Sequence, residues 1–249
     1  ISVQKVKISA KKSFSTSISG TDLIVGARSG DVQLLMYTVF RQGHPVANIS
    51  WESVKDIEKF SEVDWLVPIS LGDSHKGYPV IGTTIDYFQH YRYANKRQLK
   101  LSKGRLFQIP FEVVLGAEVA EKLGYDLDDQ LYLSHGIAKS NLPVHKNRAF
   151  KVVGILEPTR TPVDKSAHIS LEGITAIHLN PKEIKDNKSL QNIDLTPKAV
   201  TSCIVGLKSK FTIFTVQRRI TNWDSEPLMA VIPGVALSRL WNSIGTIDS

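Results

Sequence analysis

The sequence of 249 residues contains a single cysteine, Cys203, and no long run of apolar residues. One cysteine excludes an intrachain disulfide and any zinc or iron–sulfur site that needs several thiolates. A membrane-spanning helix needs about 18–20 apolar residues in succession, and no run approaches that length. The chain has no signal-peptide pattern and begins with Ile1, so we expect it to be a piece of a longer protein.

Extremes of composition are also lacking. Apolar residues make up 42% of the chain and charged residues 22%, with 16 glycines and 11 prolines. These values exclude a disordered or collagen-like chain and are typical of a globular protein. At about 150 residues per domain, the length fits one large domain or two modest ones.

The charge is basic but dispersed. There are 31 Lys and Arg residues against 24 Asp and Glu residues, which gives a net charge of +7. The sequence contains no arginine-rich stripe and no nucleic-acid-binding motif, so we predict no nucleic-acid partner. The one local concentration of positive charge is Lys5, Lys7, Lys11 and Lys12.

The two ends of the chain have a similar order of elements. Near the N-terminus the apolar pattern predicts a strand, two helices and a strand at 23–25, 30–40, 51–60 and 65–71. Near the C-terminus it predicts a strand, a helix and a strand at 202–206, 210–222 and 227–232. The first strands share a local pattern, IVGARS at 24–29 and IVGLKS at 204–209. We therefore expect two βαβ-like halves that form a four-stranded sheet covered on one face.

The middle of the chain differs from both ends. Short strands are predicted at 78–84, 111–115, 130–134 and 149–156, with helices at 117–123 and 170–177. The polar segment 180–198 is predicted to be a surface excursion or a return linker. The predicted fold is α+β, with residues 1–74 and 199–249 as two halves of an α/β subdomain and residues 75–198 as an inserted mostly-β subdomain. We expect a separate core in the insertion from Val80, Val114, Leu131, Val153 and Ile155.

The terminal segments 1–19 and 235–248 are both amphipathic at helical spacing. Neither segment ends in a capping residue at its outer end. We therefore expect two helices that continue into sequence outside this chain.

Four segments resemble the extracytoplasmic domain of permeases of the MacB and FtsX type. They are TDLIVGARSG (21–30), VVLGAEVAEKLGYDLDDQLYL (113–133), FKVVGILEPT (150–159) and EPLMAVIPGVALSRLWNSIGT (226–246). One departure is Asp128, where the family usually has glycine in the turn before the strand. Aspartate tolerates turn geometry, so this departure does not weaken the resemblance.

The resemblance implies a domain that lies between the first and second of four transmembrane helices in an ABC transporter permease. It implies a homodimer with a cytoplasmic ABC ATPase subunit, a periplasmic location at the inner membrane, and a periplasmic adaptor or lipoprotein as a further partner. The α/β subdomain would lie near the membrane, with both terminal helices at its base and Trp241 at the membrane interface. ATP hydrolysis would then drive movement or release of a lipoprotein, peptide or small molecule by mechanical transmission, without chemistry in the domain itself. An alternative is an FtsX-like activator of a periplasmic cell-wall hydrolase.

A second class of function is a hydrolytic or ligand-binding domain, and the candidate chemistry for it is sparse. The turn Gly26–Gly30 lies between a strand and a helix, as phosphate loops do, but lacks their glycine and lysine pattern. Asp73, Ser74 and His75 have the composition of a catalytic triad but are adjacent in sequence, which is incompatible with triad geometry.

The remaining titratable candidates have ordinary explanations. Glu112 and Glu118 are expected to be a solvated pair, and Cys203 a buried small hydrophobe. None of the seven histidines forms a zinc-binding helix motif. His135 and His145 flank a polar loop and could hold a metal ion with a carboxylate, a question that the sequence leaves open. We otherwise predict no catalytic, cofactor-binding or metal-binding residue.

Overall fold

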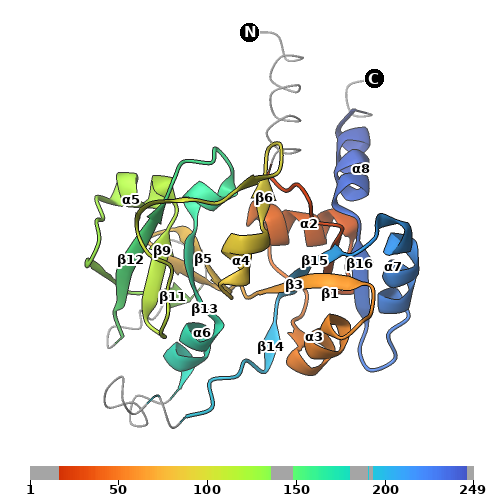
Figure 1. The fold of residues 1–249 in the computed structure, drawn as a ribbon, viewed down its shortest axis with the longest axis horizontal. Coiled ribbons are helices and arrows are strands. Elements are labelled where there is room, and N and C mark those ends of the chain that lie inside the picture. The colour runs from red at the N-terminus through yellow and green to blue at the C-terminus, as the bar shows by residue number, and fades with distance from the viewer. Residues whose placement is uncertain (1–16, 136–147, 180–189, 191–192, 246–249) are drawn as a thin grey trace.

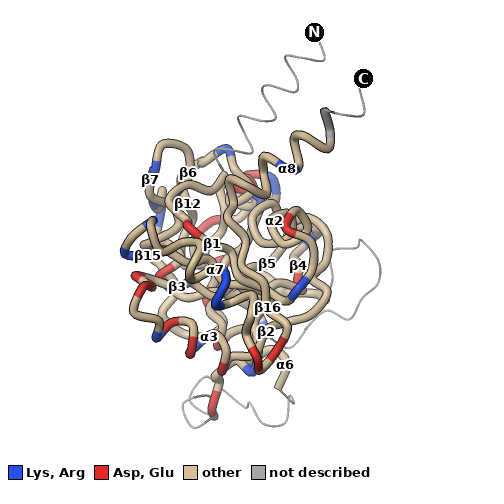
Figure 2. The backbone as a smooth tube through the Cα atoms, turned by 90° about the vertical axis from the view of Figure 1, so that its right-hand side faces the viewer, with Lys and Arg blue, Asp and Glu red and all other residues tan. Residues whose placement is uncertain are grey.

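The computed structural model of the chain describes residues 17–135, 148–179, 190 and 193–245 (Figure 1). Two lobes lie side by side. The α/β lobe comprises the four-stranded sheet β16-β1-β15-β3 and the helices packed on it, and the β lobe comprises a larger sheet with its helices. On the side that Figure 2 shows, Lys and Arg residues are interspersed with Asp and Glu residues.

The α/β lobe consists of two interleaved halves. Its strands are β1 (Leu23–Ala27), β3 (Val63–Ile69), β15 (Ser202–Leu207) and β16 (Leu228–Val231). Every neighbouring pair in the sheet is antiparallel. Because β1 and β3 both run antiparallel to β15, they point the same way with β15 between them. Likewise β15 and β16 lie on either side of β1, so each half is a split βαβ unit. The two related segments meet at the centre, where Ile24 is the cross-strand partner of Ile204.

Helices cover both faces of this sheet, so the prediction of one covered face is wrong. One face packs against α3 (Trp51–Glu58) and α7 (Ile213–Thr221), in a cluster that includes Val25 and Cys203. The other face packs against α2 (Asp31–Phe40) and α8 (Pro233–Gly245) through a second cluster. The physical reason lies in the strands: all five residues of β1 are buried, a pattern typical of a strand with apolar layers on both sides.

Local signals place the helix starts correctly. Ser50 caps α3 by accepting a hydrogen bond from the Ser53 amide, and Ser170 caps α6 (Leu171–His178) through the Gly173 amide. Pro233 ends the preceding strand as predicted but also begins α8, two residues earlier than expected, because proline is favoured in the first turn of a helix.

The strands of the β lobe form a sheet of their own, in the order β10-β12-β9-β13-β5-β4-β11, with β8 also paired to β12. Their bounds are β4 Asp73–His75, β5 Tyr78–Thr83, β8 Leu101–Gly104, β9 Glu112–Leu115, β10 Gln130–Leu131, β11 Ser134–His135, β12 Phe150–Leu156 and β13 Ala167–Ser170. Only residues 132–133 separate β10 from β11, so the two ends of the sheet lie close together and the sheet is strongly curved. The strand predicted at 130–134 is therefore two short strands at opposite ends of one sheet.

The prediction of a separate core in the insertion is only partly correct. Val80, Leu131 and Ile155 do pack together within the β lobe. Val114 and Val153 instead belong to a cluster that also contains residues of the α/β sheet. Side chains alternate between the faces of a strand, and the second face of this sheet packs against the other lobe. The two lobes thus share a hydrophobic core, and the predicted subdomain boundaries remain predictions.

Several predictions concern residues outside the described ranges. The helix predicted at 1–19 lies outside them up to residue 16, and residues 17–19 are not helical. Most of the polar segment 180–198 and the last residues of the predicted helix 235–248 also lie outside. Helix α8 projects from the α/β lobe at the top of Figure 1. No helix in the described ranges has the length and apolar character needed to cross a membrane.

Candidate functional site

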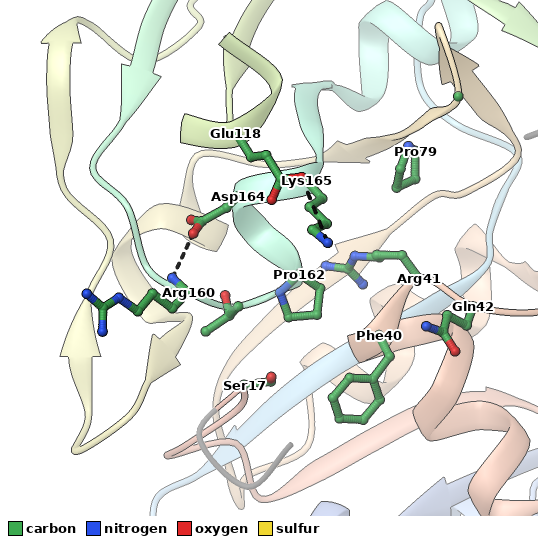
Figure 3. A pocket seen from close by; sticks show the side chains of 12 residues that line it. Ser17, Phe40, Arg41, Gln42, Pro79, Glu118, Arg160, Pro162, Asp164 and Lys165 are labelled. Atoms are coloured by element: carbon green, nitrogen blue, oxygen red, sulfur yellow. Dashed lines mark hydrogen bonds and ion pairs between the residues drawn. The ribbon is translucent and has the colours of Figure 1, made fainter. Parts of the chain in front are cut away.

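A cleft of about 520 Å³ opens between the two lobes (Figure 3). The C-terminal end of α2 forms one wall, with Phe40 and Arg41. The opposite wall comes from the β lobe: Pro79 of β5, Glu118 of α5 (Ala117–Leu123) and the loop that carries Arg160–Lys165. The cleft therefore lies where a change in the angle between the lobes would alter its width.

Arg41 is the unusual residue of this cleft. It ends α2 in the left-handed conformation, with φ 58°, and only 8% of its surface is exposed. One guanidinium nitrogen donates to the Tyr87 hydroxyl at 3.3 Å. Its Nε and Nη1 atoms have no hydrogen-bond partner among the described residues. A buried cation without a counter-charge is costly, so the Arg41 guanidinium suits a carboxylate or another anionic group in the cleft.

The acidic residues of the cleft are already engaged. Asp164 accepts hydrogen bonds from the amides of Thr159 and Arg160 at 2.8 and 2.7 Å. Glu118 forms an ion pair with Lys165 at 3.8 Å. Figure 3 shows the Arg160 guanidinium directed away from Arg41, with only its backbone joined to Asp164. Within the described residues, the oxygens of these carboxylates are therefore directed to groups other than the Arg41 guanidinium.

A buried aromatic cluster lies behind Arg41. His168 of β13 is fully buried, with its ring 5.3 Å from that of Tyr87 and its Nδ1 3.3 Å from the Val114 carbonyl oxygen. Burial, with a smaller contribution from the Arg41 charge, lowers the pKa of His168 to about 3. Burial likewise raises the pKa of Tyr87 and of Tyr91. All of these groups are neutral near pH 7.

The sequence analysis missed this cluster. The available signal was the density of aromatic residues between positions 87 and 93, where Tyr, Phe, Tyr and Tyr occur within seven residues. Two of them lie in the short helix α4 (Asp86–His90), which was not predicted either. Arg41 gave no signal, because only the packing of the β lobe against α2 buries it.

Gly26, in the turn that was compared with phosphate loops, has a structural role. A Cβ atom on Gly26 would lie 2.6 Å from the Leu34 side chain of α2. At the related position of the second half, a Cβ atom on Gly206 would lie 2.2 Å from the Trp65 ring. Both strands therefore need glycine for close packing, which explains why the pattern recurs.

The predicted triad composition does not form a triad. Ser74 Oγ lies 3.2 Å from Ser134 Oγ. Both ring nitrogens of His75 are engaged, one 2.6 Å from the Tyr132 carbonyl oxygen and the other 3.0 Å from the Tyr125 hydroxyl. Burial lowers the pKa of His75. These contacts join β4 to neighbouring segments and have a structural role.

The structure also describes three other residues that the sequence analysis singled out: Glu112, Cys203 and Asp128. Glu112 is buried and accepts hydrogen bonds from Arg105 and from the Gln108 amide, so the prediction of a solvated pair with Glu118 is wrong for Glu112. The Arg105 guanidinium holds the pKa of Glu112 below its usual range. Cys203 is fully buried in β15, as predicted, and burial raises its pKa. Asp128 has φ 70°, a conformation that glycine adopts easily and aspartate tolerates.

The sequence analysis considered His135 and His145 as a pair, whereas the structure places His178 beside His135. His145 lies outside the described residues. His135 lies beside Asp73, with its Nδ1 3.1 Å from the carboxylate, and its ring centre is 5.0 Å from that of His178. The sequence left open a site of His135, His145 and a carboxylate; the structure sets His135 beside the buried Asp73 carboxylate, and His178 is the additional residue that the tertiary structure contributes.

Comparison with known proteins agrees with this architecture. The structure is similar to the periplasmic region of MacB from Actinobacillus actinomycetemcomitans, with 12% sequence identity, 91% of this chain and 95% of that chain covered, and a TM-score of 0.55. It is also similar to the extracellular domain of the noncanonic ABC-type transporter YknZ from Gram-positive bacteria, with 11% sequence identity and a TM-score of 0.49. That match covers 84% of this chain and 98% of the YknZ chain. No curated protein matches the chain in sequence.

The family comparison is more specific than the likeness to the MacB periplasmic region, which shows the fold alone. The model of the MacB-like periplasmic core domain matches residues 6–223, most of the chain. Three of the four resembling segments, at 21–30, 113–133 and 150–159, lie within this match, and the fourth, at 226–246, lies beyond it. The chain therefore belongs to the MacB-like periplasmic core domain family, the periplasmic domains of ABC-type transporter permeases.

Proposed function

We propose that this domain transmits movements of the membrane part of a permease, driven by ATP hydrolysis in a cytoplasmic subunit, to a substrate or partner outside the inner membrane. The permease would act as a homodimer, and a periplasmic adaptor or lipoprotein would be its further partner. The domain itself would carry out no chemical step. Membership of the family supports this proposal, and one feature of the structure carries it.

That feature is a rigid connection from α8 to the cleft. Only Ile232 separates β16 from α8, so no flexible linker lies between the sheet and the helix. Ala236 of α8 is fully buried, and Leu237 packs against the core that the two lobes share. Arg239 of α8 forms an ion pair with Asp31, the first residue of α2. A displacement of α8 therefore acts directly on the start of α2.

Helix α2 extends this connection to the cleft. Its ten residues span about 15 Å at the usual rise of a helix. Its far end places Phe40 and Arg41 in the cleft wall, against the β lobe. Protein interiors are close-packed and pass on displacements rather than absorbing them. Movement of α8 by the adjoining membrane segment would thus alter the position of the β lobe relative to the α/β lobe.

The test uses the complete permease with its ATPase subunit, reconstituted in lipid nanodiscs. Spin labels at Glu121 of α5 and Arg218 of α7, both exposed, report the distance between the lobes. A control pair at Lys55 of α3 and Arg218 lies within the α/β lobe. We expect nucleotide binding to shift the distance distribution of the first pair and not that of the control. Identical distributions with and without nucleotide for the first pair would refute transmission through the cleft.

A further inference from the structure

We propose that Asp73, His135 and His178 form a binding site for a divalent transition metal ion of the zinc type, at the edge of the β-lobe sheet. The site is independent of the cleft. It involves one carboxylate and two imidazoles from three separate elements, and nothing in the proposed transmission function requires it.

The fold brings these three residues together through strand pairing and helix placement. Strands β4 and β11 are antiparallel neighbours, and Asp73 is the direct cross-strand partner of His135. His178 is the last residue of α6, which follows β13 on the same sheet. One ligand atom from each residue lies within 4.8 Å of the other two. The sequence separations, 62 and 43 residues along the chain, show that tertiary structure alone creates this grouping.

The carboxylate is the strongest indication of a cation. Asp73 is only 5% exposed, and its Oδ1 atom accepts no hydrogen bond from any described residue. That atom points at His135, 3.1 Å from its Nδ1. A buried carboxylate oxygen without a donor is destabilising unless a positive charge compensates for it. A metal ion between the carboxylate and the imidazoles supplies that charge.

The histidine of α6 has the supporting contact that metal-bound histidines usually have. His178 Nδ1 lies 2.7 Å from the Ile174 carbonyl oxygen, one turn earlier in the helix. A carbonyl can only accept, so Nδ1 carries the proton and donates it, which leaves the lone pair on Nε2. Such a contact to the second ring nitrogen orients the imidazole and fixes the tautomer that coordinates a metal.

The donor set decides the class of metal. Two imidazoles and one carboxylate suit zinc and neighbouring transition ions, whereas calcium and magnesium prefer oxygen ligands alone. Ligands of one tetrahedral zinc ion stand about 3.3–3.5 Å apart, as follows from bond lengths of about 2.0–2.1 Å. The present separations are up to 4.8 Å. The His135 side chain is 43% exposed and His178 is exposed, so small adjustments of the two rings, with the Ile174 contact of His178 kept, can bring the ligand atoms closer around the fixed carboxylate. Water would complete the coordination.

The experiment is calorimetric titration of zinc chloride into the chain after treatment with EDTA. We expect one saturable site per chain and a rise in the unfolding temperature, because zinc binds only the folded arrangement. His178→Gln should weaken zinc binding at least tenfold. The matched control is His44→Gln, which removes an exposed histidine from a loop outside the cluster and should leave zinc binding unchanged.

Proton NMR of the histidine rings gives a second readout. The ring signals of His135 and His178 should shift on addition of one equivalent of zinc, while that of His44 should not. His135→Gln should also weaken zinc binding. If this variant fails to fold, as judged by circular dichroism, the zinc affinity of His178→Gln decides the question, because the His178 side chain is exposed. Absence of saturable zinc binding in the unmodified chain, or zinc affinity of His178→Gln equal to that of the unmodified chain, would overturn the proposal. Neither result bears on the movement of the lobes.

Discussion

Acidification should destabilise this domain through one buried histidine, His168. Its ring lies in the shared region between the lobes, beside the rings of Tyr87 and Phe88 at 5.3 and 5.8 Å. The charged group that acts on it is Arg41, whose own charge opposes protonation of the imidazole. The native fold therefore holds His168 neutral well below the pH at which an exposed histidine takes up a proton.

The magnitude follows from linkage between protonation and folding. The pKa of His168 is about 3 in the folded chain, against about 6.5 for an unperturbed histidine in the unfolded chain. Above pH 6.5 both states are neutral, and the stabilisation is fully present. As the pH falls below about 6.5, the unfolded state binds a proton that the native state does not, and each unit costs about 1.4 kcal/mol. From about pH 7 to about pH 4, His168 alone should remove roughly 3 kcal/mol from the free energy of unfolding.

Urea unfolding at these two pH values, followed by circular dichroism, measures the effect. His168→Phe should lose roughly 3 kcal/mol less than the unmodified chain over this range, whatever its stability at neutral pH. His44→Gln, an exposed control, should lose as much as the unmodified chain. His75 has a pKa lowered by burial and contributes a loss of the same sign, which is common to all three proteins. Equal losses in His168→Phe and the unmodified chain would refute the assignment of a neutral buried imidazole.

Three further outcomes are expected. Glu112→Ala should lower the free energy of unfolding, measured in urea, by about 1.5–3 kcal/mol, because a buried carboxylate that accepts several hydrogen bonds is removed. The control Glu118→Ala, at a more exposed carboxylate, should lose less than about 1 kcal/mol, and equal losses in the two variants would contradict this. Gly206→Ala should cost about 1–3 kcal/mol because the new methyl group meets the Trp65 ring, whereas Gly234→Ala has no atom within 4 Å and should be tolerated in the same assay. The chain alone should not hydrolyse ATP, since it lacks a lysine-bearing phosphate loop; a phosphate-release rate above that of buffer in contaminant-free protein would disprove this.

The sequence alone determined the family and many of the local elements. Apolar runs and spacing predicted the four strands of the α/β lobe and the helices packed on them, and the caps at Ser50 and Ser170 were correctly located. These features depend on residues close together in the chain, where side-chain spacing and capping chemistry decide the conformation. The related segments that contain Gly26 and Gly206 also marked the two halves, which the structure shows interleaved.

Tertiary structure decided everything that depends on which surfaces meet. A strand buried on both faces has no alternation that reveals its two partners, so the second helical layer was not foreseen. Val114 and Val153 face the other lobe because adjacent strand residues point to opposite sides, and only the docking of the lobes makes that second side apolar. The same docking buries Arg41 and His168, and strand pairing sets Asp73 opposite His135. Such contacts join residues far apart in sequence, where no local pattern specifies them.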